Sequence, residues 1–311
     1  MSDELTTPQV VDDLSDAPEF SKAIKDIISG TSGGIAQVLV GQPFDITKVR
    51  MQTSSGSPTA IEVIKNLVKN EGLLAFYKGT LAPLIGVGAC VSCQFGVNEA
   101  MKRYFLRVNG YKDQHLSLLQ YYTCGFVSGS ANAFLATPIE HVRIRLQLQT
   151  KALAKAEYRG SLDCMKKLLK QKALMRGFTA TLMRTSHGFG VYFLTYEALI
   201  MNQNKNGVLR KDIPPWKVCV FGAFSGAFFW AMTYPFDVVK SIMQADRLVS
   251  PVHGKNVFQV AKSIHATRGW GAFVKGFVPT MLRSLPVNGA TFATFEVTMR
   301  LLESLDKVAY T

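Results

Sequence analysis

Basic residues are missing from the first twenty positions of this 311-residue chain, MSDELTTPQVVDDLSDAPEF, whose charged side chains are all acidic. Secretory signals begin with a positively charged region, and organelle transit peptides are rich in arginine. We therefore expect targeting information to lie in the body of the chain. Since the segment is charged and has little apolar surface to bury, we predict a disordered acidic tail over residues 1–22.

Cysteine is scarce, and no pattern of it points to a metal. The five cysteines are odd in number, and the single CxxC, Cys90 to Cys93, lacks a second CxxC or a histidine pair. No Ser-His-Asp constellation, phosphate loop or cluster of metal ligands is discernible. We therefore predict no catalytic residue, no metal and no cofactor, and expect that the protein is not an enzyme.

Acidic residues are few, 22 against 35 Lys and Arg, so the formal net charge is +13. A nucleic acid, an anionic membrane surface or an acidic small molecule would each suit such a charge. A basic helical scaffold that binds nucleic acid therefore stays open as an alternative. No recognised nucleic-acid motif accompanies the charge, so we expect no nucleic-acid partner.

One ten-residue pattern occurs three times, as PFDITKVRMQ from Pro43, PIEHVRIRLQ from Pro138 and PFDVVKSIMQ from Pro235. The prolines are 95 and 97 residues apart (138−43 and 235−138). Glycine pairs spaced four apart precede each copy, at Gly30 and Gly34, Gly125 and Gly129, and Gly222 and Gly226. Such pairs let helices approach closely, as they do in lipid. The chain is therefore predicted to be a threefold repeat.

Apolar segments follow the same period. Long ones lie at 24–52, 80–103, 117–149, 179–203, 215–245 and 278–302, and short amphipathic ones at 58–70, 160–170 and 256–266. Each long segment holds roughly the 20 residues that cross a bilayer, and the short ones resemble interfacial helices. We predict an all-α membrane protein with six transmembrane helices in three pseudo-symmetric repeats, each with a short amphipathic helix.

The repeated charges suggest a gate. A proline within a helix bends it, so three bent helices at Pro43, Pro138 and Pro235 can converge at one end. We predict a ring of ion pairs there: Asp45 with Arg143, Glu140 with Lys240, and Asp237 with Lys48. Charges within a membrane protein must be paired or wetted, which suits a gate that closes and opens. The glutamines one turn further on are predicted to brace the pairs by hydrogen bonds: Gln52, Gln147 and Gln244.

The three P-x-[DE]-x-x-[KR] copies, with the downstream echoes EGLLAFYKG, QKALMRG and RGWGAFVKG, resemble the mitochondrial carrier family over nearly the whole chain after the tail. The likeness is closest to fungal members of the carnitine, ornithine and amino-acid branch, particularly glutamate-type carriers, through GGIAQVLVGQPFD, GVGACVSCQFGVNEAMKR and PVNGATFATFE. It implies a multi-pass secondary transporter of the mitochondrial inner membrane, working by alternating access, with the predicted ring as its matrix-side gate. We expect repeats at 23–112, 113–211 and 212–303, a monomer, and bound lipid including cardiolipin, near the basic residues Lys78, Arg176 and Lys275.

A second gate, on the cytoplasmic side, departs from the family pattern. Members often carry an acid and a base three residues apart on each even-numbered helix, and here only Glu99 and Lys102 fit. Glu197 and Glu296 lack such a base, because Ile200 and Met299 stand in its place. We expect this to be the weaker gate, so that the protein favours the outward-open form.

By resemblance, the substrate contacts are Gly86, Arg184 with Thr185, and Arg283, each set seven residues beyond a repeated glycine. A guanidinium suits a carboxylate, and an arginine in a membrane helix is costly enough to need a task. The alternative is that other protein groups hold these arginines. His187 is either a further substrate contact or a packing residue. We predict a small carboxylate, most of all an amino acid such as glutamate, with carnitine or acylcarnitine and an oxo- or dicarboxylate as alternatives.

Overall fold

The computed structural model describes residues 19–54, 56, 58–110, 116–150, 157–205, 208 and 210–309, which form helices and their connections with no strand among them. Within these residues six helices are long: α1 (Glu19–Thr53), α3 (Leu81–Val108), α4 (Leu118–Leu148), α6 (Phe178–Lys205), α7 (Pro215–Ala245) and α9 (Phe277–Ala309). Three are short: α2 (Ala60–Glu71), α5 (Ser161–Lys170) and α8 (Val257–Arg268). The same described residues contain three 3-10 turns: η1 (Leu73–Tyr77), η3 (Arg210–Asp212) and η4 (Trp270–Val274).

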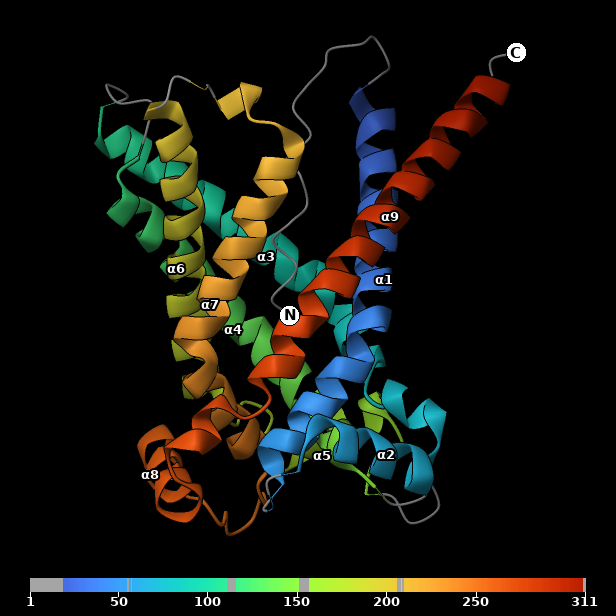
Figure 1. Cartoon of the computed structure of the whole chain (residues 1–311), viewed down its shortest axis with the longest axis vertical. Helices are drawn as coiled ribbons and strands as arrows, with labels where there is room; N and C mark the ends of the chain where they lie inside the picture. Colours follow the sequence, from blue (N-terminus) through green and yellow to red (C-terminus); the bar gives the residue numbers. More distant parts are fainter. Residues whose placement is uncertain are drawn as a thin grey trace.

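The order long, short, long occurs three times, which confirms the predicted all-α repeat. Helix α1 begins at Glu19, and residues 1–18 of the predicted tail lie outside the described residues. Figure 1 shows the short helices gathered at one end, drawn at the bottom, which we call the inner end.

Local sequence explains where the short helices start. Thr59 begins α2 with a capping box, in which its hydroxyl accepts from the Glu62 amide and the Glu62 carboxylate accepts from the Thr59 amide. Asn256 and Gln259 form the same box at α8. The turn into α9 needs a glycine, because Gly276 has φ +83° and a Cβ there would lie 2.9 Å from the Tyr234 hydroxyl.

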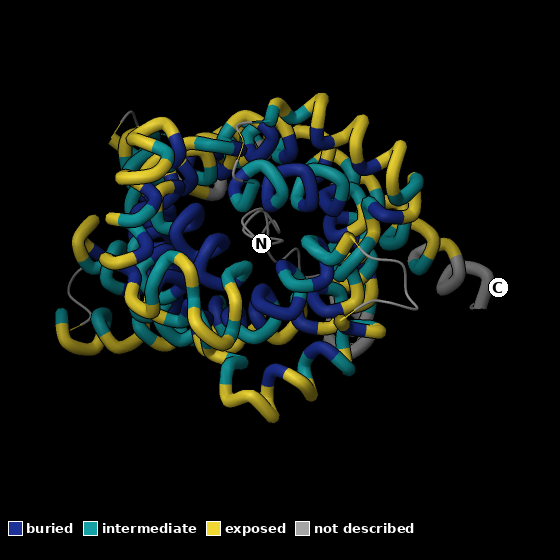
Figure 2. Tube along the Cα trace, turned by 90° about the horizontal axis from the view of Figure 1, so that it is seen from below, coloured by how far each residue is buried: buried dark blue, intermediate teal, exposed yellow. Residues whose placement is uncertain are grey.

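The long helices form a ring, and Figure 2 shows buried residues facing its centre and exposed residues outside. The predicted prolines Pro43, Pro138 and Pro235 lie inside α1, α4 and α7. Figure 1 shows the lower part of α1 inclined against its upper part, as expected when a proline removes a helical hydrogen bond. Helix α9 also contains a proline, Pro286, outside the repeated motif.

The ring is packed unevenly along its circumference. Between α4 and α6, a Cβ on Gly125 would lie 2.3 Å from the Phe189 carbonyl oxygen, and one on Gly129 would lie 2.3 Å from that of Thr185. Among the described residues nothing lies within 4 Å of such a Cβ on Gly30 of α1 or on Gly226 of α7. The repeated glycines therefore bring helices into close contact in the second repeat, whereas Gly30 and Gly226 have open space beside them.

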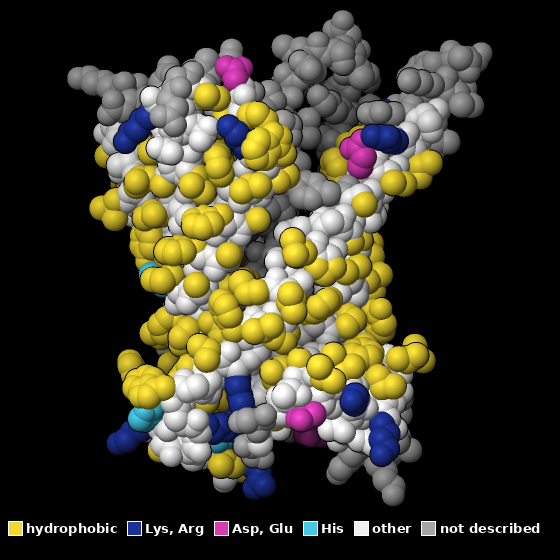
Figure 3. Space-filling model, in the orientation of Figure 1, with side chains coloured by type: hydrophobic (Ala, Val, Ile, Leu, Met, Phe, Trp, Pro, Cys, Tyr) yellow, Lys and Arg dark blue, Asp and Glu magenta, His cyan; other side chains and the backbone are white. Residues whose placement is uncertain are grey.

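Apolar side chains cover the outside of the ring. On the face drawn in Figure 3 they form a broad band at mid-height, with charged side chains at both ends. Exposed members of this surface include Leu39, Ile85, Phe134, Phe224 and Leu285. By length and composition, two segments are apolar enough to cross a membrane, Leu73–Val108 and Trp216–Ala245. The second of these, α7, also carries two of the inward-facing charges described below, Asp237 and Lys240.

Candidate functional site

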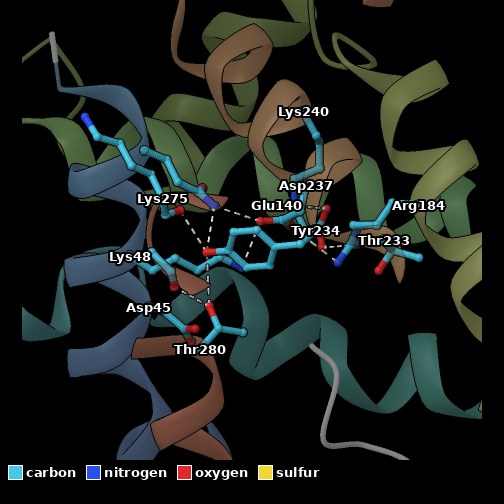
Figure 4. A network of polar contacts seen from close by, with 12 residues as sticks. Asp45, Lys48, Glu140, Arg184, Thr233, Tyr234, Asp237, Lys240, Lys275 and Thr280 are labelled. Atoms are coloured by element: carbon cyan, nitrogen blue, oxygen red, sulfur yellow. Dashed lines mark hydrogen bonds and ion pairs between the residues drawn. The ribbon is translucent and has the colours of Figure 1, made fainter. Parts of the chain in front are cut away.

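The three repeated motifs meet at the centre of the inner end. Asp45 contacts Arg143, Glu140 accepts from Lys240 at 3.0 Å, and Asp237 lies 2.8 Å from the Lys48 ammonium. All three ion pairs anticipated from the sequence are therefore formed, each between neighbouring repeats, as Figure 4 shows for part of the network. The six side chains are between 2 and 14% exposed. We call this set the inner ring.

The three glutamines behave differently from one another. Gln52 donates to Asp237 at 3.1 Å and to the Tyr234 hydroxyl at 3.3 Å, so it braces one pair. Gln147 has no side-chain hydrogen-bond partner in the described part of the chain. Gln244 donates to the Arg176 carbonyl at 3.3 Å. The predicted brace geometry is thus wrong for the last two, and Gln42, which the sequence reading missed, accepts from Arg143 at 2.6 Å.

The residue before each proline accounts for the contact of Gln244. Gln42 and Tyr234 occupy that position in the first and third repeats, and each donates to the carbonyl of the base before a repeated glycine, Lys78 at 2.8 Å and Lys275 at 2.9 Å. Thr137 occupies it in the second repeat, and its short hydroxyl bonds to its own helix at Ala133. The equivalent carbonyl, that of Arg176, accepts from Gln244 instead.

Both predicted substrate arginines reach the inner ring. Arg184 lies 2.7 Å from Glu140 and 3.8 Å from Asp237, and Arg283 lies 3.2 Å from Asp45. Acids of the protein therefore hold both guanidiniums in this conformation, which was the alternative interpretation. Five bases face three acids here, an excess of two positive charges. Such a cluster attracts an anion.

The other two predicted contacts point elsewhere. Gly86 packs against α4, where a Cβ on it would lie 2.3 Å from the Ile139 side chain, so its small size leaves no free wall. The Thr185 hydroxyl donates to the Gly129 carbonyl at 2.9 Å and fastens α6 to α4. Gly41 of α1 was missed: a Cβ there would lie 2.7 Å from the Arg283 guanidinium, so a larger residue would have to displace it.

A cavity of about 50 Å³ lies between the inner ring and the two arginines. Among its lining residues that no pattern in the sequence singled out are Trp230 of α7 and Thr280 of α9. The Lys48 ammonium sits over the Trp230 ring, 4.3 Å from its centroid. From the sequence of α7 alone, Trp230 would be assigned to the hydrophobic core. Its contact with a cation arises only because α1 packs against α7 and places Lys48 over the ring.

The residues predicted for the second, cytoplasmic-side gate do not contact one another across the ring. Glu99 and Lys102 pair within α3 at 2.8 Å, and Glu296 pairs with Arg300 of its own helix at 2.7 Å. Glu197 is buried and bound by Arg210 of η3 at 3.0 Å. Among the described residues, none of these acids is paired with a base of another long helix. Arg300 was missed because it follows its acid by four residues instead of three.

A layer of hydrogen bonds beneath the inner ring joins the repeats. Lys78, Arg176 and Lys275 each donate to a backbone carbonyl just beyond the end of a proline-containing helix of another repeat. The acceptors are Gln149 after α4 at 2.9 Å, Arg247 after α7 at 2.6 Å and Gly56 after α1 at 2.7 Å. In the first repeat, Glu71 binds both Arg50, at 2.5 Å, and Lys78. Burial would raise the pKa of Glu71, but hydrogen bonds from these two bases hold it below its usual value. The ends of α1, α4 and α7 are thereby held together.

His187 lies between helices instead of in the cavity. Its Nδ1 is 2.9 Å from the Tyr122 hydroxyl, and the two rings pack edge to face. Its packing interpretation is therefore the one that the geometry supports. Within the described residues no cluster of three or more metal-binding side chains occurs.

The chain matches the family described as mitochondrial carrier protein over residues 20–109, 114–206 and 211–305. It is 60% identical to the mitochondrial glycine transporter YMC1 of Saccharomyces cerevisiae, over 97% of this chain and all of that one. It is 46% identical to the glutamate/glycine mitochondrial carrier ymc1 of Schizosaccharomyces pombe, over 92% and 97% of the two chains. Against the human mitochondrial basic amino acids transporter the identity is 37%, over 88% and 89%.

Proposed function

The chain belongs to the mitochondrial carrier family, and we propose that it carries a small amino acid, glycine or glutamate, across the mitochondrial inner membrane. It is a transporter and not an enzyme. The observation that carries the substrate class is the pair of buried arginines above the inner ring, with an excess of two positive charges around them. A carboxylate entering the ring would find both guanidiniums within reach.

The substrates after which the relatives are named support an amino acid over the alternatives. Those substrates are glycine, glutamate with glycine, and basic amino acids. A substrate of net positive charge is poorly suited to a cluster that already has two unbalanced bases. Carnitine and its esters would bring a bulky quaternary ammonium, and an oxo- or dicarboxylate would leave Asp237 and its aromatic neighbours without a role.

The path is one of alternating access through the centre of a single chain. In this proposal all six long helices cross the membrane, residues 23–112, 113–211 and 212–303 each supply a third of the wall, and the inner end faces the matrix. The inner ring is the matrix-side gate, with Pro43, Pro138 and Pro235 as its bends. Glu99, Lys102, Glu197 and Glu296 act at the cytoplasmic end, where they come together only after closure.

Lipid and subunit number follow from the same layout. Each repeat has its own short helix at the inner end, and those of the second and third repeats carry an excess of basic residues, so anionic headgroups such as cardiolipin would bind there. Lys78, Arg176 and Lys275 already bond to carbonyls, so the lipid would meet the outer faces of these helices. One ring contains the whole path, which supports a monomer.

Reconstitution into liposomes tests the proposal. Liposomes loaded with glycine or glutamate are assayed for exchange against labelled glycine, glutamate, aspartate, ornithine, carnitine, 2-oxoglutarate and malate. We expect exchange of glycine or glutamate, and a fall of at least about 100-fold in Arg184→Ala and Arg283→Ala, because each loses a buried charge partner worth about 3 kcal/mol. Trp270→Phe, at an exposed aromatic of η4, serves as the control and should retain exchange. Full activity of either arginine variant would refute this substrate site.

A further inference from the structure

Lys48 is held by more than its acidic partner. Its ammonium lies 2.8 Å from Asp237, 4.3 Å from the centroid of the Trp230 ring and 5.4 Å from that of Tyr234. Trp230 and Asp237 are seven residues apart on α7, two helical turns, so they present one face. An aromatic face beside a carboxylate is a typical binding site for an ammonium group.

The same carboxylate lies next to a guanidinium. The Asp237 Oδ1 atom is 3.8 Å from Arg184 Nη1. A guanidinium on α6 that can bind a substrate's carboxylate therefore lies beside a carboxylate on α7 that can bind its ammonium group. In an α-amino acid, one carbon atom separates the ammonium nitrogen from the carboxylate. Its two charged groups therefore match this spacing, whereas those of a γ-amino acid or of carnitine are farther apart.

We propose that Trp230 and Asp237 form the subsite for the substrate's ammonium group, and that the Lys48 side chain occupies this subsite while the inner ring is closed. The inference rests on the proposed function, which supplies the carboxylate contact at Arg184. An incoming amino acid is first held through its carboxylate. When α1 and α7 separate, Lys48 leaves Asp237, and the substrate's ammonium takes its place.

This exchange links substrate chemistry to opening. Separation of Lys48 from Asp237 alone would expose a buried carboxylate without its closest partner, which is costly. An ammonium that arrives in its place removes that cost. The contact between the substrate's ammonium and Asp237 forms only as the ring opens. It therefore speeds transport without raising the affinity of the initial complex with the substrate. Carboxylates without an amine should therefore bind from outside but cross slowly.

Ligand binding to the purified full chain in detergent tests the subsite. The Lys48→Gln substitution removes the ammonium group that occupies the subsite, so the substrate does not have to open the ring to reach it. Affinities are measured from thermal stabilisation by two matched pairs, glycine with glycolate and glutamate with 2-hydroxyglutarate, in which a hydroxyl replaces the ammonium. We expect K48Q to tighten glycine and glutamate by about tenfold, the scale of a desolvated cation–π contact, and to leave the hydroxy acids unchanged. β-Alanine and γ-aminobutyrate should gain progressively less.

Two controls separate the subsite from a general effect of charge. Adding Trp230→Leu to K48Q should remove the gain, whereas adding Trp216→Leu, at an exposed tryptophan of the same helix, should not. Lys240→Gln also removes a base 3.2 Å from Asp237, but among the described residues it is Lys48 that lies over the Trp230 ring, so the gain in K240Q should be well below that in K48Q.

Several results would overturn the subsite. They are equal changes for amino and hydroxy acids in K48Q, a gain that survives W230L, and equal gains in K48Q and K240Q. The wild-type exchange assay, with glycolate and 2-hydroxyglutarate added to its panel, keeps the two proposals apart. If hydroxy acids are exchanged as fast as amino acids, the ammonium subsite is wrong and the carboxylate carrier stands. If neither class is exchanged, the proposed function itself is wrong.

Discussion

Each acid of the inner ring serves two purposes at the scale of single residues. Asp45 holds Arg143 of the ring and Arg283 above it, and Glu140 holds Lys240 and Arg184 in the same way. A substrate carboxylate that binds Arg184 or Arg283 therefore removes one of the bases that hold an acid of the inner ring. Substrate site and gate are thus one connected network of charges.

Gln52 offers the sharpest test of a single brace. Gln52→Leu removes two buried hydrogen bonds, to Asp237 and to Tyr234, each with a net worth of about 1 kcal/mol. We expect a lower melting temperature in detergent and faster exchange, because the closed ring is weakened. Gln147→Leu is the matched control, as the Gln147 side chain has no partner in the described structure. If both variants melt alike, Gln52 is no brace.

At the scale of elements, contact between two helices depends on which carbonyl a glycine faces. In the second repeat, Gly125 and Gly129 lie against the α6 backbone, and Thr185 and Ser130 add hydrogen bonds across the contact, the latter to Ser186 at 2.8 Å. In the first repeat, Gly30 has open space. The same glycine motif therefore has different effects in different repeats. In the second repeat it allows the close packing of α4 against α6, whereas beside Gly30 in the first repeat it leaves open space.

A matched pair of alanines measures this difference. Gly129→Ala puts a methyl 2.3 Å from the Thr185 oxygen, so α4 and α6 must separate, at a cost of about 1–3 kcal/mol or more. Gly30→Ala meets nothing within 4 Å among the described residues. In thermal unfolding we expect a clear loss of stability for G129A and no loss for G30A. Equal melting temperatures would show that the close contact contributes nothing.

At the scale of the whole molecule, the pairs run in one direction around the ring. The first repeat's acid binds the second repeat's base, the second binds the third, and the third binds the first. Three separate segments of the chain are thereby closed into a cycle, and the layer of carbonyl contacts beneath follows the same order. Breaking one link leaves a buried charge in each of two repeats.

A charge swap tests the cycle. Asp45→Lys or Arg143→Glu alone places like charges together, and we expect exchange to fall about 100-fold, from a loss of about 3 kcal/mol. The double variant restores an ion pair and should recover part of the rate. Recovery stays incomplete, because the new lysine would face Arg283, which is 3.2 Å from Asp45 in the native chain. Harmless single swaps, measured in the liposome assay, would contradict a closed cycle.

The sequence by itself determined the repeat, the nine helices expected within it, and the three partners across the ring, because proline, acid and base recur at one period and charges in lipid must pair. Only the tertiary structure decided which arginine each acid also holds, which glutamine braces a pair, and what faces Trp230 and Gly86. Those contacts depend on how far each side chain reaches toward the next helix. Equivalent helices of the three repeats have similar backbones but are surrounded by different side chains. A hydroxyl at Thr137, where the other repeats have a glutamine or a tyrosine, is enough to redirect Gln244.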